Sequence, residues 1–156
     1  MELLIDALLE WISEETGRDT SGMPHPQIAE MTPRALTREF YADHPYLIPE
    51  DGQDERIQAL YAATDGPDGR IYILAAATFD GADDFEDPYE NPVWREVLLH
   101  ELVHHLQWQA GEPANWACRN FGEEEAYRLG GRYLRRTRTT DPMPNRNFWA
   151  HAYSRC

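Results

Sequence analysis

The clearest absence in this chain is lysine: it has 156 residues and no Lys, so all 14 of its basic side chains are Arg. Twice as many side chains are acidic, 28 in all, and the formal net charge is −14. Proteins that bind nucleic acids or anionic membranes present an excess of positive charge to them. The composition therefore argues against nucleic acid and against a membrane surface as partners.

Long apolar segments and cysteines are also scarce. No apolar run approaches the roughly 20 residues that span a bilayer, and the first residues lack the positive charge of a signal peptide. We therefore expect a cytoplasmic protein, the alternative being the mature part of an exported one. Cys118 and Cys156 are too few for a disulfide scaffold. We expect reduced thiols, although a disulfide between the two would suit an exported protein.

The residues that are present predict a single α+β domain over 1–156. Hydrophobic residues make up 42% of the chain, enough for one core at this length. Residues 1–50 are expected to be a helical part, with one helix ending near Gly17 and another starting at Thr32-Pro33. Residues 57–74 alternate in the manner of strands around a turn at 65–69, which predicts a β-hairpin. The acidic segment 80–90 is expected to be a solvated loop; the alternative of a calcium site lacks the EF-hand order of ligands.

The strongest helix signal covers residues 92–110. Asn91-Pro92 is a typical start, and Gly111 is a typical end. Apolar residues lie on nearly every face between them, which indicates a buried helix. A further helix is predicted over 123–136, and the tail 137–156 is expected to be loop-like except for an aromatic cluster at 148–153.

Inside the buried helix stands the motif His100-Glu101-Leu102-Val103-His104. Residues four apart lie on one face of a helix, so both imidazoles can bind the same metal ion. Glu101 lies about 100° further round, where its carboxylate can take a proton from metal-bound water. This arrangement suits Zn²⁺. The alternative is a pair of core histidines with protein partners and no metal; His105 is on another face and is expected to be structural or solvent-facing.

A catalytic zinc needs a third protein ligand. The extended motif HExxHxxGxxH is not present, because Gln107 and Ala110 occupy the positions of its glycine and third histidine. The helix at 123–136 offers three glutamates, of which Glu123 lies about 60° from the centre of the apolar face, nearer than Glu124 or Glu125. We therefore predict Glu123 as the third ligand.

Each of these glutamates also has a plain structural explanation. Glu123 could form a capping box with Asn120, since the spacing Asn-x-x-Glu fits. Glu124 and Glu125 could simply complement the helix dipole. The prediction for Glu123 therefore depends on the direction in which its side chain points.

HExxH followed by a short connection and the segment Glu123-Glu124-Glu125-Ala126-Tyr127 resembles the gluzincin metallopeptidases, especially the small minigluzincins. The resemblance covers roughly residues 57–134 and implies a zincin-like fold, in which the family's edge strand beside the cleft would fall within the hairpin. It also implies Glu123 as zinc ligand. Tyr127 departs from the family, which usually has an Asp there to hold a zinc-binding histidine.

The implied activity is hydrolysis of a peptide or protein substrate by a water that zinc activates, with Glu101 as general base. Tyr127, His151 and Tyr153 are candidates for an oxyanion donor or for support of the ligands. One alternative is a catalytically silent zinc-binding sensor or interaction module on a peptidase scaffold. The other is a structural helical domain without metal.

Overall fold

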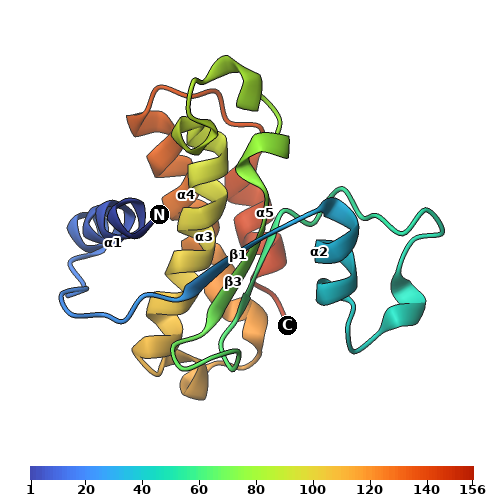
Figure 1. The fold of residues 1–156 in the computed structure, drawn as a ribbon. Helices are drawn as coiled ribbons and strands as arrows, with labels where there is room; N and C mark the ends of the chain where they lie inside the picture. The colour runs from blue at the N-terminus through green and yellow to red at the C-terminus, as the bar shows by residue number, and fades with distance from the viewer.

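The computed structural model describes all 156 residues and shows an α+β fold with five α-helices and a three-stranded mixed sheet (Figure 1). The helices are α1 (Glu2–Thr16), α2 (Pro33–Phe40), α3 (Pro92–Gln109), α4 (Glu123–Arg136) and α5 (Arg146–Tyr153). The strands are β1 (Gln27–Met31), β2 (Ala59–Ala62) and β3 (Arg70–Leu74). None of the helices combines the length and the apolar composition that crossing a bilayer requires.

The sheet contains the predicted hairpin and one further strand. β2 and β3 pair antiparallel, with Ala59 opposite Ile73 and Ala62 opposite Arg70. β1 pairs parallel with β3, so the strand order is β1-β3-β2 and β2 is an edge. The expectation of a helical part over 1–50 therefore misses this strand, although both expected helices are present. β1 contains a single β-branched residue, Ile28, and its pairing partner lies 43 residues away in the sequence, so local patterns do not identify it.

The two faces of the sheet carry cores of very different size. The main core lies between the sheet and α1, α3 and α4, and α3 runs through its centre (Figure 1). Ile71 and Ile73 of β3 point into this core, and both are fully buried. The opposite face carries Tyr72, which packs with Leu36 of α2 and with Ile57 in a small second cluster. Helices α3 and α4, which carry His100, Glu101, His104 and Glu123, both contribute to the larger core.

Helix α3 begins and ends as the sequence predicts. The side chain of Asn91 accepts a hydrogen bond from the backbone N–H of Val93, and Pro92 is the first helical residue. Gly111 follows the helix in the left-handed conformation, with φ of 70°. Eleven of the 18 residues are buried, and the indole of Trp94 donates to the Leu74 carbonyl. The helix is therefore fixed to the sheet at one end and buried along its length.

The tail contains a fifth helix and a disulfide. The aromatic cluster at 148–153 lies in a helix, α5. Cys118 and Cys156 form a disulfide with a Cα–Cα distance of 5.7 Å, so the expectation of reduced thiols is wrong. The physical reason is that α5 returns the chain to the segment that precedes α4, where Asn120 donates a hydrogen bond to the carbonyl of Arg155 at 3.1 Å.

Candidate metal centre

One side of helix α3 carries a polar stripe, which we define as Glu96, His100, His104 and Gln107. The spacings of four, four and three residues bring these side chains back to nearly the same side of an α-helix. Each of them contacts the segment Gly122–Arg136 or α5. The rest of the helix is mostly apolar, so the stripe marks the line along which α3 meets polar groups.

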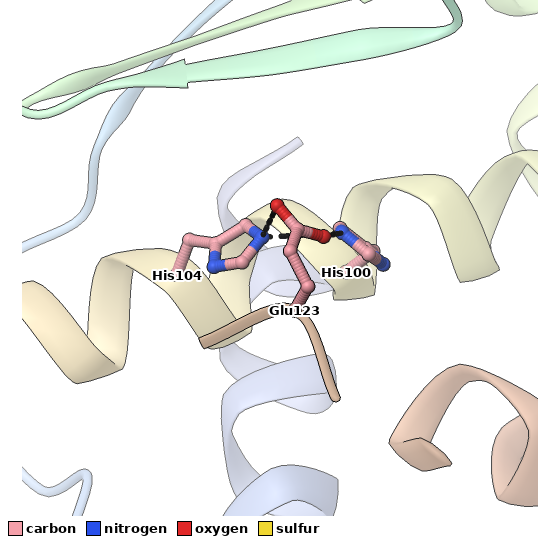
Figure 2. Close-up of side chains that lie close together, drawn as sticks. All are labelled: His100, His104 and Glu123. Carbon is pink, nitrogen blue, oxygen red and sulfur yellow. Dashed lines mark hydrogen bonds and ion pairs between the residues drawn. The ribbon is translucent and has the colours of Figure 1, made fainter. Parts of the chain in front are cut away.

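The two histidines of the motif face each other from successive turns of α3. Their Nε2 atoms are 3.1 Å apart, and their rings are inclined at 76°. Figure 2 shows both rings turned toward the same point. The side chain of His100 is 13% exposed and that of His104 is 16% exposed, so neither ring has much contact with water.

Glu123 reaches this point from the first residue of α4 (Figure 2). Its Oε2 lies 3.1 Å from Nε2 of His100, and its Oε1 lies 3.4 Å from Nε2 of His104. The capping box with Asn120 does not form, because Gly122 occupies the N-cap position and Asn120 bonds to Arg155 instead. The structure therefore places Glu123 where the prediction of a third ligand needs it.

The neighbouring glutamates point elsewhere. Glu124 pairs with Arg128 on the surface of α4. Glu125 pairs with Arg18 and accepts a hydrogen bond from Gln107. Neither is bonded to a motif histidine, and Glu123 is the glutamate of the three that faces them.

The three side chains fit the requirements of a zinc site. Ligand atoms about 2.0–2.1 Å from a zinc ion in tetrahedral geometry lie about 3.3 Å from one another. The two Nε2 atoms are 3.1 Å apart, Oε2 of Glu123 is 3.1 Å from that of His100, and Oε1 of Glu123 is 3.4 Å from that of His104. This is also the one group of three or more His, Cys, Asp or Glu side chains in the chain whose possible ligand atoms converge, all within 4.8 Å. The Glu123 side chain is 30% exposed, so solvent reaches the site from one side.

Glu101 is buried beside the histidines, with 8% of its surface exposed. Burial raises the pKa of its carboxyl above the ordinary value, and the charges of His100 and His104 partly oppose that shift. The backbone of Tyr61 in β2 acts in the opposite direction and lowers the pKa of this carboxyl. A carboxyl with a raised pKa next to a site of this kind can both accept and return a proton.

His104 and Glu123 shift each other's pKa values in opposite directions. Burial lowers the pKa of His104, but the hydrogen bond to Glu123 and the charges of Glu101 and Glu123 outweigh burial and raise it to about 9. Burial alone would raise the pKa of Glu123, yet its bonds to the two histidines bring it well below the ordinary range. These opposite shifts favour a charged imidazole beside a charged carboxylate, and a metal ion would compete with the proton for the same nitrogen.

Aromatic side chains cover one histidine. The ring of Tyr127 packs on His100 with a centroid distance of 4.6 Å, and Tyr153 of α5 lies 5.5 Å from Tyr127. Burial raises the pKa of Tyr127 far above its ordinary value, so its hydroxyl keeps its proton at neutral pH. His151, the third candidate named from the sequence, lies near Glu124 and Arg155, and 57% of its side chain is exposed.

Two further groups on or near α3 have structural roles. His105 is fully buried between the sheet and the segment after α1, with its ring nitrogens 2.8 Å from the Pro24 carbonyl and 3.1 Å from the Tyr61 hydroxyl. Oε1 of Gln107 lies 2.9 Å from Nδ1 of His104. In the sequence this residue is notable only because it replaces the glycine of the extended motif. The acidic segment 80–90 gathers no ligand cluster, so the calcium alternative gains no support.

A family model described as "Domain of unknown function (DUF6647)" matches residues 1–146. The matched range includes the motif helix, the start of α4 and therefore every residue of the three-ligand cluster. No curated protein and no solved structure matches the chain.

Proposed function

The chain belongs to the DUF6647 family, and we propose that it is a zinc-dependent metallopeptidase of the gluzincin type, with a zincin-like arrangement of hairpin, motif helix and ligand helix. One observation carries the proposal. Two imidazole nitrogens and a carboxylate approach one another at the 3.1–3.4 Å expected around a zinc ion. A fourth side chain, Glu101, is buried beside them with a raised pKa.

In this proposal His100, His104 and Glu123 hold the ion and Glu101 moves the proton. Zinc bound there would supply Lewis-acid chemistry, lowering the pKa of a water toward 7 and polarising a carbonyl. Glu101 accepts the proton of the attacking water and then delivers it to the leaving amine. Its burial favours the first step, because a carboxyl whose pKa is raised takes up a proton more readily than one in water.

The edge strand β2 supports a peptide as substrate. It pairs only with β3, so its other edge offers free backbone groups to an extended chain. β2 packs against α3, the helix that carries Glu101 and both motif histidines. A peptide added to β2 would therefore run past the three-ligand cluster.

Tyr127 is the best of the candidate oxyanion donors. Its ring lies against His100, and its hydroxyl stays protonated at neutral pH. Tyr153 packs against Tyr127, with ring centroids 5.5 Å apart. His151 faces Glu124 and Arg155 and is a weaker candidate.

The decisive experiment is Glu101→Gln, with Glu124→Gln as a matched control on a surface glutamate. Purified proteins are assayed for zinc by elemental mass spectrometry and for hydrolysis with fluorescently labelled casein and a mixed peptide library read by mass spectrometry. We expect full zinc occupancy in both variants. Hydrolysis should fall by about 10²–10⁴-fold in Glu101→Gln, the usual contribution of a general base, and should be unchanged in the control.

The outcomes separate the alternative functions. Stoichiometric zinc without hydrolysis in the wild-type protein would contradict the peptidase and favour the silent zinc-binding module. Wild-type protein that binds no zinc would leave only the structural domain. Equal hydrolysis in Glu101→Gln and wild type would show that another group acts as the base.

A further inference from the structure

Gln107 is the most completely bonded side chain of the polar stripe. It is 1% exposed, and its amide makes three hydrogen bonds. Oε1 lies 2.9 Å from Nδ1 of His104, and Nε2 lies 3.1 Å from the Gly122 carbonyl and 3.0 Å from Oε2 of Glu125. A buried amide bonded on all sides is held in one orientation.

The partners of Gln107 determine which nitrogen of His104 carries a proton. The Gly122 carbonyl can only accept a hydrogen bond and Glu125 accepts one here, so both must face the NH₂ group of the amide. The amide oxygen therefore faces His104 and accepts from Nδ1–H. A neutral His104 with its proton on Nδ1 has the lone pair on Nε2, the nitrogen that faces His100 and Glu123.

The residue opposite the amide has to be a glycine for steric reasons. A Cβ on Gly122 would lie 2.5 Å from Oε1 of Gln107 and 2.6 Å from the ring of Trp116. The backbone conformation there, with φ of −72°, is open to any residue, so conformation is not what requires glycine. The local structure before α4 therefore leaves room for this amide.

On the side away from His104, the bonds of Gln107 lead to a cavity. Oε1 of Glu125 lies 3.1 Å from Arg18, which also pairs with Glu112 at 3.2 Å. A cavity of about 530 Å³ borders Gln107, Arg18 and both of these glutamates. A continuous line of hydrogen bonds thus connects this cavity to His104 through Glu125 and Gln107.

We propose that Gln107 is a positioning residue for the metal ligand His104: it holds the ring with Nε2 toward the ion, while Glu125 and Arg18 hold the amide. In this chain the residue that supports a zinc-binding histidine therefore comes from α3 itself. In the gluzincins, which the sequence resembles, an Asp at the position of Tyr127 has this role. The inference rests on the metal site of the proposed function and does not depend on peptidase activity.

The test compares Gln107→Met with Gln109→Met, which removes the same group from an exposed position of the same helix. Zinc affinity is measured by competition with a chromophoric chelator, and the His104 Nδ1–H proton of the zinc-loaded protein is followed by NMR. We expect Gln107→Met to bind zinc about 10–100-fold more weakly, the usual effect of removing such a partner, and to lose the slowly exchanging Nδ1–H signal. Gln109→Met should match the wild type in both.

A second pair of variants keeps the test valid if Gln107→Met does not fold. Glu125→Met removes the acceptor that orients the amide, while Glu125→Gln keeps an oxygen in its place, and the side chain is 31% exposed. Zinc affinity should fall several-fold in Glu125→Met and recover in Glu125→Gln. Tight zinc binding with a protected Nδ1–H signal in Gln107→Met, or no difference within the Glu125 pair, would overturn the role of Gln107 and leave the metal site standing. A wild-type protein without zinc would overturn both.

Discussion

Helix α3 carries two buried polar clusters one turn apart, and they are completed in different ways. The first, around Glu96, contains Arg146 and Asp141: Arg146 donates to Glu96 at 2.8 Å and to the two oxygens of Asp141 at 2.7 and 2.9 Å. The side chains of Glu96 and Arg146 are only 6% and 8% exposed. The second cluster joins His100, His104 and Glu123 at 3.1–3.4 Å.

The difference lies in the source of positive charge. Arg146 comes from α5 and gives the first cluster a permanent cation. Gly130 of α4 makes room for the pair, since a Cβ there would collide with Oε1 of Glu96. Glu123 has no Arg within ion-pair distance and meets only the two imidazoles. Burying ionisable groups is costly unless they are paired or bind a metal, and the second cluster is therefore the one that we expect to take its cation from solution.

The largest effect should come from removing the internal cation. Arg146→Met leaves Glu96 buried without a partner, which should lower the free energy of unfolding by about 3–5 kcal/mol. Denaturant titration measures this change in the free energy of unfolding. Arg128→Met serves as the control, because its ion pair with Glu124 is exposed on the surface and contributes about 0.3–0.5 kcal/mol. Equal losses in the two variants would show that the Glu96 cluster does not need its arginine.

The second-largest effect should come from adding zinc. Free zinc at 100 times its dissociation constant should stabilise the wild-type protein by about 2.7 kcal/mol, measured as a shift in the denaturation midpoint. His104→Ala removes one of the three ligands, so zinc should no longer stabilise that variant. Arg146→Met keeps all three ligands, and zinc should stabilise it as much as the wild type. If zinc stabilises His104→Ala as much as the wild type, the ion binds elsewhere.

The smallest effect is the response of the first cluster to acid. Burial would raise the pKa of Asp141, but its bonds with Arg146 bring the pKa below the ordinary value of 3.8. The folded state therefore keeps this carboxylate charged where the unfolded chain protonates it. The resulting stability is present above about pH 4 and is lost as the pH falls through the lower, folded pKa. Because Asp141 is partly exposed, we expect a contribution below about 1 kcal/mol.

Unfolding curves between pH 6 and pH 2.5 test this contribution. Asp141→Asn should be less stable than the wild type at pH 6, and the gap should narrow toward pH 2.5. A gap that stays constant over this range would mean that the charge of Asp141 does not contribute.

Sequence patterns predicted the parts of the molecule that depend on local spacing. The ends of α3 follow from Asn91 and Gly111, and the helical period brings His100 and His104 to one side. The same period, applied to α4, selected Glu123 from three adjacent glutamates, and the structure places it beside those histidines. Its role as a metal ligand stays a prediction.

The features that the sequence did not predict depend on residues far apart in the chain. β1 exists because it pairs with β3 across 43 residues, and the Glu96–Arg146 pair joins residues 50 apart. The hydrogen bonds of Gln107 form only because Gly122 and Glu125, which are distant in the sequence, lie against it. The disulfide needs α5 to bring Cys156 back to Cys118. For β1 the decisive fact is the pairing with β3, and for the other three it is the packing of α4 and α5 onto α3.

The bond between Cys118 and Cys156 turns the last quarter of the chain into a closed ring. Glu123 and Tyr127 lie inside this ring, as does Tyr153, which packs over Tyr127. A protease that nicks the turn between α4 and α5 would therefore leave both pieces tethered. Such a cut would be visible on a gel only after a reductant is added. Until then Glu123 and Tyr127 would stay attached to the piece that carries Tyr153.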